Sequence, residues 1–321
     1  MSDPLVSIVI NNYNYARFIR GAIDSALDQD YPRVEVVVVD DGSTDGSRDI
    51  ILSYGDRIKA VIKPNGGQAS AFNAGVVASS GTILCFLDSD DFFSTDKVSR
   101  VVETFRVHGL DATPMMVHHL LSIKDDGNQG IEGRPYGRTH NSPMNLYAFA
   151  QRHRFVWYEA GPTTTISINR SLANLLFPIP EEGVRVSADD FVVCGAFLLG
   201  DVYSLADVLG SYRVHGGNNW FHSDHKKSGV FLLGLQNYLN AKLIESGRLP
   251  VIDYDNSIYA WHRLRAERRW LALLAHMLRL SIRDHDRYTA LFVYHTLMTI
   301  GMQAKQSLQS RVGLVKAAPG S

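Results

Sequence analysis

Four short runs of hydrophobic residues divide the first ninety residues of the chain, and each run ends in polar side chains. The runs are Leu5–Ile10, Val34–Val39, Ile58–Ile62 and Thr82–Leu87. They are almost continuously apolar and rich in β-branched residues, which is typical of strands that are buried on both faces of a sheet. Because segments of helical length separate most of them, we predict a mostly parallel sheet that is flanked by helices.

The same reading of periodicity predicts the remaining elements. Apolar residues from Phe18 to Leu27 recur at helical spacing, and residues 69–79 and 96–107 also predict helices. Further strands are predicted at residues 115–123, 163–168 and 202–214, and further helices at residues 142–152, 171–177 and 189–198. From Asp224 onward the chain is expected to be almost entirely helical.

Carboxylates gather where two of the predicted strands end. Asp88, Asp90 and Asp91 follow the fourth strand, and Asp41 follows the second. Ligands of open α/β sheets bind at the carboxyl ends of the strands. Crowded carboxylates repel each other unless a cation lies between them, and hard oxygen ligands suit Mg²⁺ or Mn²⁺. The pattern favours a metal-assisted phosphate-ester or nucleotide-sugar site, and an acidic loop that caps the next helix is the alternative.

Four motifs stand in order at these strand ends. They are VSIVINNYN from Val6, VVVDDGSTD up to Asp45, the Asn65-x-Gly67-x-x-x-Ala71-x-Asn73-x-Gly75 spacing, and LDSDD up to Asp91. Together they resemble the large family 2 group of inverting GT-A glycosyltransferases. The resemblance implies an α/β fold of the GT-A type, which is Rossmann-like with a mostly parallel central sheet. It also implies a nucleotide-sugar donor, a divalent metal (Mn²⁺ or Mg²⁺) and inversion at the sugar carbon.

The resemblance also assigns roles at the nucleotide end of the site. Asp41 is expected to hydrogen-bond the base of the nucleotide, as a carboxylate does with the imide N–H of uracil. Asn12, Tyr13 and Asn14 are expected to border the same nucleoside. The donor is therefore expected to be a UDP-sugar.

Asp88 and Asp90 form an Asp-x-Asp pair, which is expected to lie at the diphosphate end of the site. Asp90 is the preferred direct metal ligand, with Asp91 as the alternative, and Asp88 is expected to reach the ribose or a metal-bound water. Related enzymes often carry a basic residue where this chain has Phe72. Either that basic contact is missing here, or Lys63 replaces it.

Two motifs further along resemble the acceptor half of the same family. Asp189 and Asp190 resemble its Glu-Asp pair, in which Asp190 is the general base and Asp189 orients it or holds acceptor hydroxyls. The pair also fits the first turn of a helix, where a carboxylate is electrostatically favoured. Arg213 and His215 resemble the Tyr-Arg-x-His motif and are expected to hold phosphate oxygens, with His215 as a further metal ligand.

These expectations divide the chain into a GT-A domain at residues 1–220 and a helical C-terminal region at residues 221–321. Within the domain, residues 1–110 form the nucleotide-binding half and residues 111–220 form the acceptor half. The segment from His262 to Arg283 mixes apolar residues with arginines. It is expected to pack on the core or in a homo-oligomer, and contact with an anionic membrane surface is the alternative.

Composition narrows the function further. The 321 residues carry a net charge of −1, which argues against a nucleic-acid partner, and the chain has only two cysteines. A cytoplasmic location is expected, with the inner face of the membrane as the alternative. The predicted acceptor is a carbohydrate or a lipid-linked sugar in surface polysaccharide or glycolipid synthesis. A nucleotidyltransferase that makes nucleotide sugars and a non-catalytic carbohydrate- or nucleotide-binding module are the competing interpretations.

Overall fold

The computed structural model describes residues 3–110, 113–131, 135–156, 160–216 and 229–257, together with residues 260, 264, 267 and 269–284. Contacts within the chain divide it into two units. Residues 1–148 and 156–250 form the first unit, and residues 149–155 and 251–321 form the second. Helix α9 (Gly229–Glu245) therefore groups with the first unit, whereas the sequence placed it in a C-terminal region. The predicted boundary at residue 220 lies outside the described residues.

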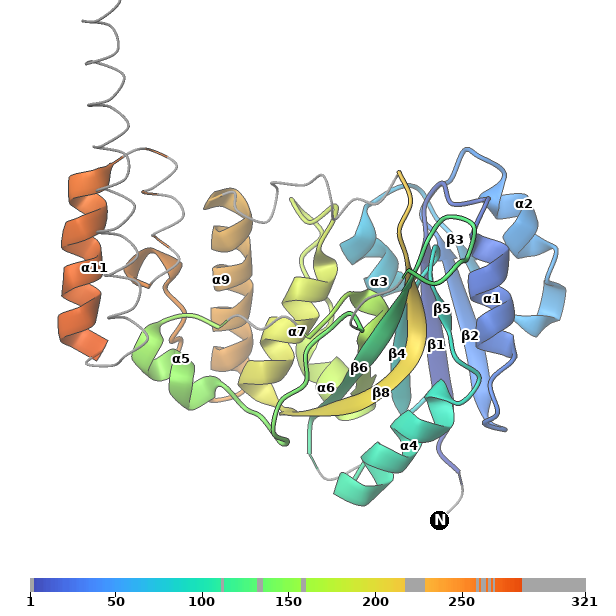
Figure 1. Cartoon of the computed structure of the whole chain (residues 1–321), viewed down its shortest axis with the longest axis horizontal. Helices are drawn as coiled ribbons and strands as arrows, with labels where there is room; N and C mark the ends of the chain where they lie inside the picture. Colours follow the sequence, from blue (N-terminus) through green and yellow to red (C-terminus); the bar gives the residue numbers. More distant parts are fainter. Residues whose placement is uncertain are drawn as a thin grey trace, which may run out of the picture. The chain divides into compact units, whose positions relative to one another are not determined.

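An eight-stranded sheet forms the centre of the first unit (Figure 1). In spatial order its strands are β3 (Lys59–Ile62), β2 (Val34–Asp40), β1 (Val6–Asn12), β4 (Ile83–Asp88), β7 (Ser167–Asn169), β6 (Met115–Lys124), β8 (Asp201–Arg213) and β5 (Phe92–Phe93). The first four pair in parallel, as do β6 with β8, whereas β7 and β5 pair antiparallel with their neighbours. The predicted mostly parallel sheet is confirmed.

The register of β1 brings the polar strand ends together. Asn12 lies opposite Asp40 of β2, and Asn11 lies opposite Asp88 of β4. Parallel strands place their carboxyl ends at one edge, so residues far apart in the chain meet there. This edge of the sheet is where the sequence predicts a ligand.

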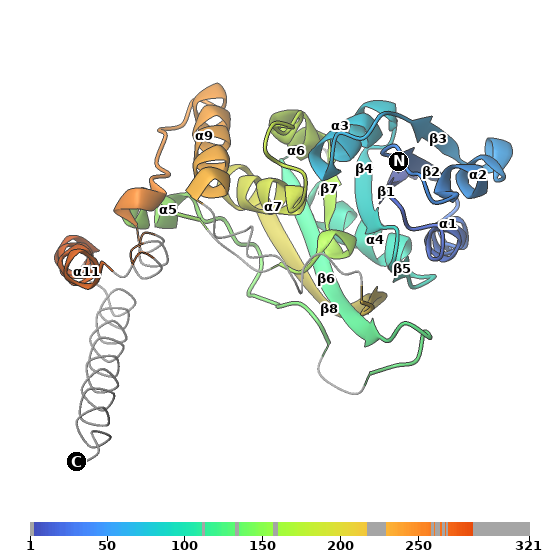
Figure 2. The same ribbon diagram turned by 90° about the horizontal axis from the view of Figure 1, so that it is seen from above.

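Helices cover both faces of the sheet in the first unit (Figures 1 and 2). Their bounds are α1 (Ile19–Leu27), α2 (Ser47–Leu52), α3 (Gln68–Ala78), α4 (Lys97–His108), α6 (Arg170–Leu176) and α7 (Ala188–Leu199), with short 3-10 helices η1 (Gly55–Arg57) and η2 (Thr163–Thr165). Helices α1, α2 and α4 pack against one face, and α3 packs against Val37 and Val39 of the other. The predicted helices before residue 110 are confirmed to within one or two residues.

Two elements of the second half differ from their predictions. The helix expected at residues 142–152 is α5 (Tyr147–His153), and the Met144 N–H instead donates to the Val202 carbonyl at 2.9 Å. The strand expected at residues 163–168 begins with η2, where the Thr165 hydroxyl donates to the Pro162 carbonyl at 2.9 Å. Local pairing of this kind competes with regular structure and is not visible in hydrophobic periodicity.

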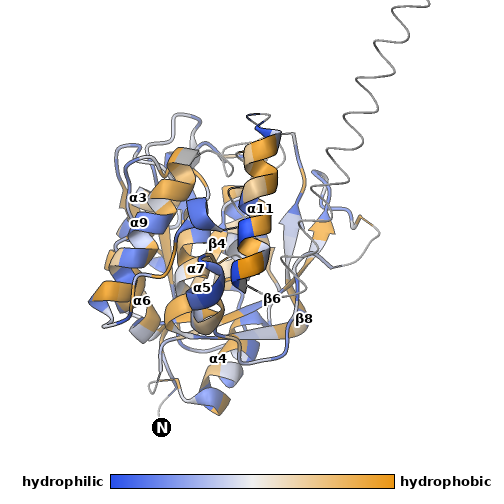
Figure 3. Ribbon diagram, turned by 90° about the vertical axis from the view of Figure 1, so that its left-hand side faces the viewer, coloured by the Kyte–Doolittle hydropathy of each residue, from blue (hydrophilic) through white to orange (hydrophobic). Residues whose placement is uncertain are grey.

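After α9, the described residues are less helical than the sequence predicts. Residues 246–253 contain no helix, and helical structure resumes with η4 (Tyr254–Asn256) and α11 (Trp270–Asp284). Figure 3 shows hydrophobic residues along α11, of which Leu273 and Met277 are buried and Leu271 and Ile282 are exposed. None of the helices among the described residues is both long and apolar enough to cross a bilayer.

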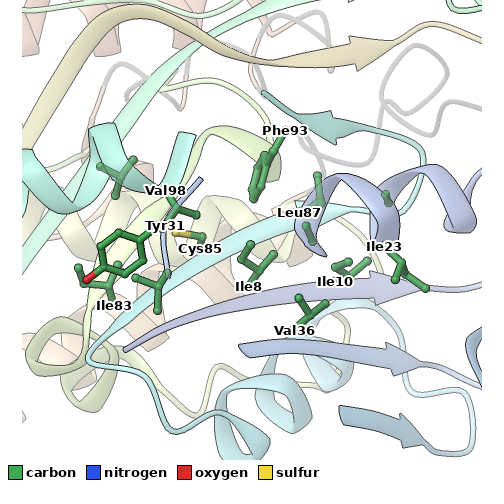
Figure 4. Packing of buried hydrophobic residues seen from close by; sticks show 14 of the residues in the cluster. Ile8, Ile10, Ile23, Tyr31, Val36, Ile83, Cys85, Leu87, Phe93 and Val98 are labelled. Atoms are coloured by element: carbon green, nitrogen blue, oxygen red, sulfur yellow. The ribbon is translucent and has the colours of Figure 1, made fainter. Parts of the chain in front are cut away.

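The core of the first unit explains how the strand ends are held. Ile8 and Ile10 of β1 and Cys85 of β4 face α1 and α4, and they are fully buried (Figure 4). Close packing on this scale makes the sheet a rigid base, because interiors of proteins are as dense as organic crystals. Cys85 and Cys194 are both buried and form no disulfide with each other.

Candidate functional site

A cavity of about 360 Å³ opens at the carboxyl ends of β1, β2 and β4. That volume lies in the range that small-molecule ligands need. Its walls also come from the loops before α3 and α7, from η2 and from β8. Six of the predicted site residues line it, namely Asn12, Tyr13, Asp41, Asp88, Asp90 and Asp189. The other predicted residues surround the cavity without lining it, namely Asn14, Lys63, Asp91, Asp190, Arg213 and His215.

The end of β1 is held by side-chain hydrogen bonds to the loop after β2. The Asn12 amide donates to Asp40 Oδ1 at 2.9 Å and to the Ser43 hydroxyl at 3.0 Å. Asn14 has a φ of 60° and accepts from the Thr44 N–H at 2.7 Å. Asparagine tolerates this left-handed conformation, so Asn14 shapes the turn. Tyr13 is 47% exposed and lines the cavity.

Asp41 is buried and organises the loop that follows β3. Lys63 Nζ donates to Asp41 Oδ1 at 2.6 Å, so the two side chains form an ion pair. The N–H groups of Gly66 and Gly67 donate to the same carboxylate at 2.9 and 2.7 Å, and the Asn65 amide donates at 3.2 Å. The sequence predicts Asp41 and Lys63 as separate ligand contacts, and the structure joins them to each other.

The acidic end of β4 concentrates negative charge at the cavity wall. Burial, followed by repulsion from Asp90 and Asp189, raises the pKa of Asp88 to about 8. The Asn11 amide donates to Asp88 Oδ1 at 3.2 Å and partly offsets this effect. A carboxyl group whose ionised form is this disfavoured gains stability from a nearby cation.

Asp90 and Asp91 have different surroundings, which their sequence spacing does not reveal. Asp91 is 1% exposed, and it accepts from the Thr164 hydroxyl at 2.6 Å and from the Arg213 N–H at 2.9 Å. These bonds tie the end of β4 to η2 and β8. Asp90 instead lines the cavity and lies 3.0 Å from His215 Nε2. The structure therefore leaves Asp90, beside Asp88, as the carboxylate that is available to a ligand.

The Arg213–His215 segment packs under the same edge. The Arg213 guanidinium lies 4.9 Å from the centre of the Phe18 ring, and its Nε donates to the Asp90 carbonyl at 2.9 Å. The His215 ring lies 4.7 Å from that of Phe18. The two residues consequently hold the backbone and the side chain of Asp90, respectively.

Asp189 and Asp190 occupy the first turn of α7, as the sequence predicts. Asp189 lines the cavity and contributes to the raised pKa of Asp88, so the two carboxylates share one electrostatic environment. Asp190 does not line the cavity, and its N–H donates to the Ser187 carbonyl at 3.2 Å. Ser187, which precedes the helix, has a φ of 62°. A non-glycine residue in this conformation is strained, as is common near functional sites.

Sequence reasoning missed several residues of the cavity wall. They are Gln68, Tyr136, Thr163, Arg185 and Tyr212, among others. Arg185 lies in a loop whose composition shows no functional pattern, and it reaches the cavity only because that loop packs against residues 65–68. Phe72, where a basic residue was considered, is buried with its ring centre 5.0 Å from that of Phe86.

The residues at the end of β4 fit a divalent cation that is only partly held by protein. Among the described residues, no group of three or more His, Cys, Asp or Glu side chains has a metal-binding arrangement. Asp88 and Asp90 nevertheless supply hard oxygen atoms, and a cation between them would relieve the repulsion that raises the pKa of Asp88. Mg²⁺ is commonly held by one or two carboxylates and completed by substrate phosphates, which matches this arrangement.

Comparison with solved structures identifies the fold class. TarS of S. aureus, solved in complex with UDP-GlcNAc, is 17% identical with a TM-score of 0.56, over 94% of this chain and 92% of that one. The mannosyltransferase PcManGT from Pyrobaculum calidifontis, solved with GDP-Man and Mn²⁺, is 18% identical with a TM-score of 0.50, over 95% and 87%. The fold is that of the GT-A glycosyltransferases.

The sequence comparisons narrow the class to a family. Residues 7–153 match the family described as "Glycosyl transferase family 2". The protein "Uncharacterized glycosyltransferase alr2836" of Nostoc sp. is 34% identical over 264 residues, which cover 79% of this chain and 80% of that protein. The chain belongs to glycosyltransferase family 2, and the family resemblance predicted from its motifs is confirmed.

Proposed function

We propose that this glycosyltransferase is inverting and metal-dependent, and that it transfers a sugar from a UDP-sugar to a hydroxyl group of a carbohydrate or lipid-linked acceptor. Its product would belong to a surface polysaccharide or glycolipid. The observation that carries the proposal is that one cavity is lined both by Asp88 and Asp90, at the end of a parallel strand, and by Asp189 of α7. Such a site can hold a diphosphate at one end and deprotonate an acceptor at the other.

The nucleotide would lie across the ends of β1 and β2. The exposed Tyr13 ring offers a face for stacking the base, and the Asp41 carboxylate shapes the loop that faces it. Asp90 would be the direct ligand of the divalent cation, supported by Asp88, while His215 fixes the Asp90 carboxylate. The bound cation would neutralise the diphosphate and stabilise the negative charge of the departing UDP oxygen.

The acceptor hydroxyl must lose its proton as its oxygen attacks the anomeric carbon from the side opposite the leaving diphosphate. A carboxylate of the α7 pair would take that proton, and attack from the opposite side inverts the configuration. The family resemblance favours Asp190 as the base, whereas Asp189 is the carboxylate that lines the cavity. Catalytic contacts often tighten only when substrate is bound, so the role of general base is assigned to the pair as a whole. Separate substitution of Asp189 and of Asp190 decides which of the two is the base.

Binding of nucleotides tests this proposal directly. UDP with Mn²⁺ is expected to raise the melting temperature of the protein, because a ligand that binds only the folded state stabilises it. EDTA should abolish the shift. A larger shift with GDP or dTDP than with UDP would refute the choice of donor. Radiolabel transfer and slow hydrolysis from a panel of UDP-sugars would then identify the sugar, and the absence of both would refute the catalytic role.

A further inference from the structure

The walls of the cavity carry an imbalance of charge. Four carboxylates line it, namely those of Asp41, Asp88, Asp90 and Asp189. Among the lining residues that the structure describes, Arg185 is the one with a positively charged side chain. Lys63 does not line the cavity, and its ammonium is paired with Asp41 at 2.6 Å. A donor diphosphate would therefore enter a largely acidic site whose cationic group is Arg185.

The backbone of Arg185 is fixed by contacts between two loops. The Gln68 N–H donates to the Arg185 carbonyl at 3.0 Å, and the Ala188 N–H donates to the Gln68 side chain at 3.0 Å. Gly67, with a φ of +91°, passes so close that an added Cβ would lie 2.7 Å from the Arg185 Cα. These contacts make a close-fitting junction between the loop that Asp41 organises and the start of α7.

The side chain of Arg185, by contrast, is exposed at the cavity wall. Its guanidinium donates to Asn65 Oδ1, a neutral acceptor. This hydrogen bond uses only part of the guanidinium, which carries five N–H donors in a planar fork. The fork matches the geometry of two phosphate oxygens, and charge-assisted bonds of this kind are about twice as strong as neutral ones.

We propose that Arg185 binds the diphosphate of the nucleotide-sugar donor, exchanging its bond to Asn65 for phosphate oxygens. This inference rests on the proposed function, because it assumes that a nucleoside diphosphate occupies the cavity. It assigns the protein-derived positive charge of the site to the loop before α7. The same loop continues into the helix that carries Asp189 and Asp190, so the donor contact and the acidic pair belong to one short segment.

Calorimetric titration of uridine, UMP and UDP in the presence of Mn²⁺ tests the assignment. Arg185→Met is expected to weaken UDP binding about 10- to 100-fold, which is the usual contribution of a hydrogen bond to a charged group. Uridine binding should change less than about twofold, since uridine has no phosphate. Arg185→Lys, which keeps the charge but loses the fork, should lie between the wild type and Arg185→Met.

Arg33→Met is the matched control, because Arg33 is exposed and precedes β2 at the opposite edge of the sheet. This substitution also removes one arginine charge, and the variant should bind UDP as tightly as the wild type does. Thermal melting of all variants checks that they are folded. If the wild type binds no nucleoside diphosphate, the proposed function itself fails. If the wild type binds UDP and Arg185→Met or a folded Arg185→Lys binds it equally well, or loses uridine to the same extent, Arg185 is not the diphosphate contact.

Discussion

Replacing Asp88 with asparagine should stabilise the metal-free protein, and the gain should grow with pH. The folded-state pKa of Asp88 is raised from 3.8 to about 8 by burial and by the charges of Asp90 and Asp189. An acid with a raised pKa contributes its stability below its unfolded pKa, and that stability is lost as the pH rises through the folded value. The amide cannot ionise, and it can still accept the hydrogen bond from Asn11.

The magnitude follows from the slope of this linkage. Between pH 5 and pH 7 the Asp88 carboxyl is protonated in the folded state and ionised in the unfolded state, so the wild type loses about 1.4 kcal/mol per pH unit. The full effect over this interval is about 2.7 kcal/mol. Because the side chain lies at the partly exposed cavity wall, solvent screening reduces it, and we expect a gain of about 1–2 kcal/mol for Asp88→Asn relative to the wild type.

Urea unfolding in EDTA at pH 5, 6, 7 and 8 measures this gain. Asp49→Asn, which removes an exposed carboxylate from α2, is the matched control, because it makes the same substitution away from the cavity. Mn²⁺ with UDP should stabilise the wild type and have little effect on Asp88→Asn. A stability difference that is constant between pH 5 and pH 7, or an Asp88→Asn protein that is less stable than the wild type at pH 7, would refute the electrostatic reasoning.

Four further substitutions test other parts of the site and its support. Asp190→Asn and Asp189→Asn should both keep UDP binding, and the one that replaces the general base should lower turnover by about 10²- to 10⁴-fold in transfer assays; normal turnover of both would exclude the pair. Lys97→Met should raise the free energy of unfolding by about 1 kcal/mol at pH 6 and by less at pH 9. Burial lowers the pKa of Lys97, and no ion pair among the described residues neutralises its charge. Equal urea midpoints for variant and wild type at pH 6 would contradict this. Ser187→Gly should raise stability by up to about 1 kcal/mol, because glycine adopts a φ of 62° without strain, and a lower melting temperature would show that the serine side chain is needed.

Much of the fold and part of the site could be predicted from the sequence, because the relevant signals are local. The strands β1, β2 and β4 are continuous apolar runs, and a parallel sheet requires their polar ends to meet at one edge. The positions of Asp41 and Asp88 at that edge therefore follow from periodicity alone. The position of Asp189 and Asp190 at the start of α7 was predictable in the same way, since they directly precede a helical apolar pattern, whereas their role as an acidic pair rests on the family resemblance.

Only the tertiary structure decided which of these residues line the cavity. Asp90 and Asp91 are neighbours in a turn, and the side chain of Asp91 is taken up by Thr164 and by the Arg213 N–H, more than seventy residues away. Lys63 is removed from the cavity by Asp41. Arg185 enters it because its loop packs against Gly67 and Gln68. Hydrophobic periodicity reports the direction of burial within one element, whereas hydrogen bonds between distant loops depend on packing that no local pattern encodes.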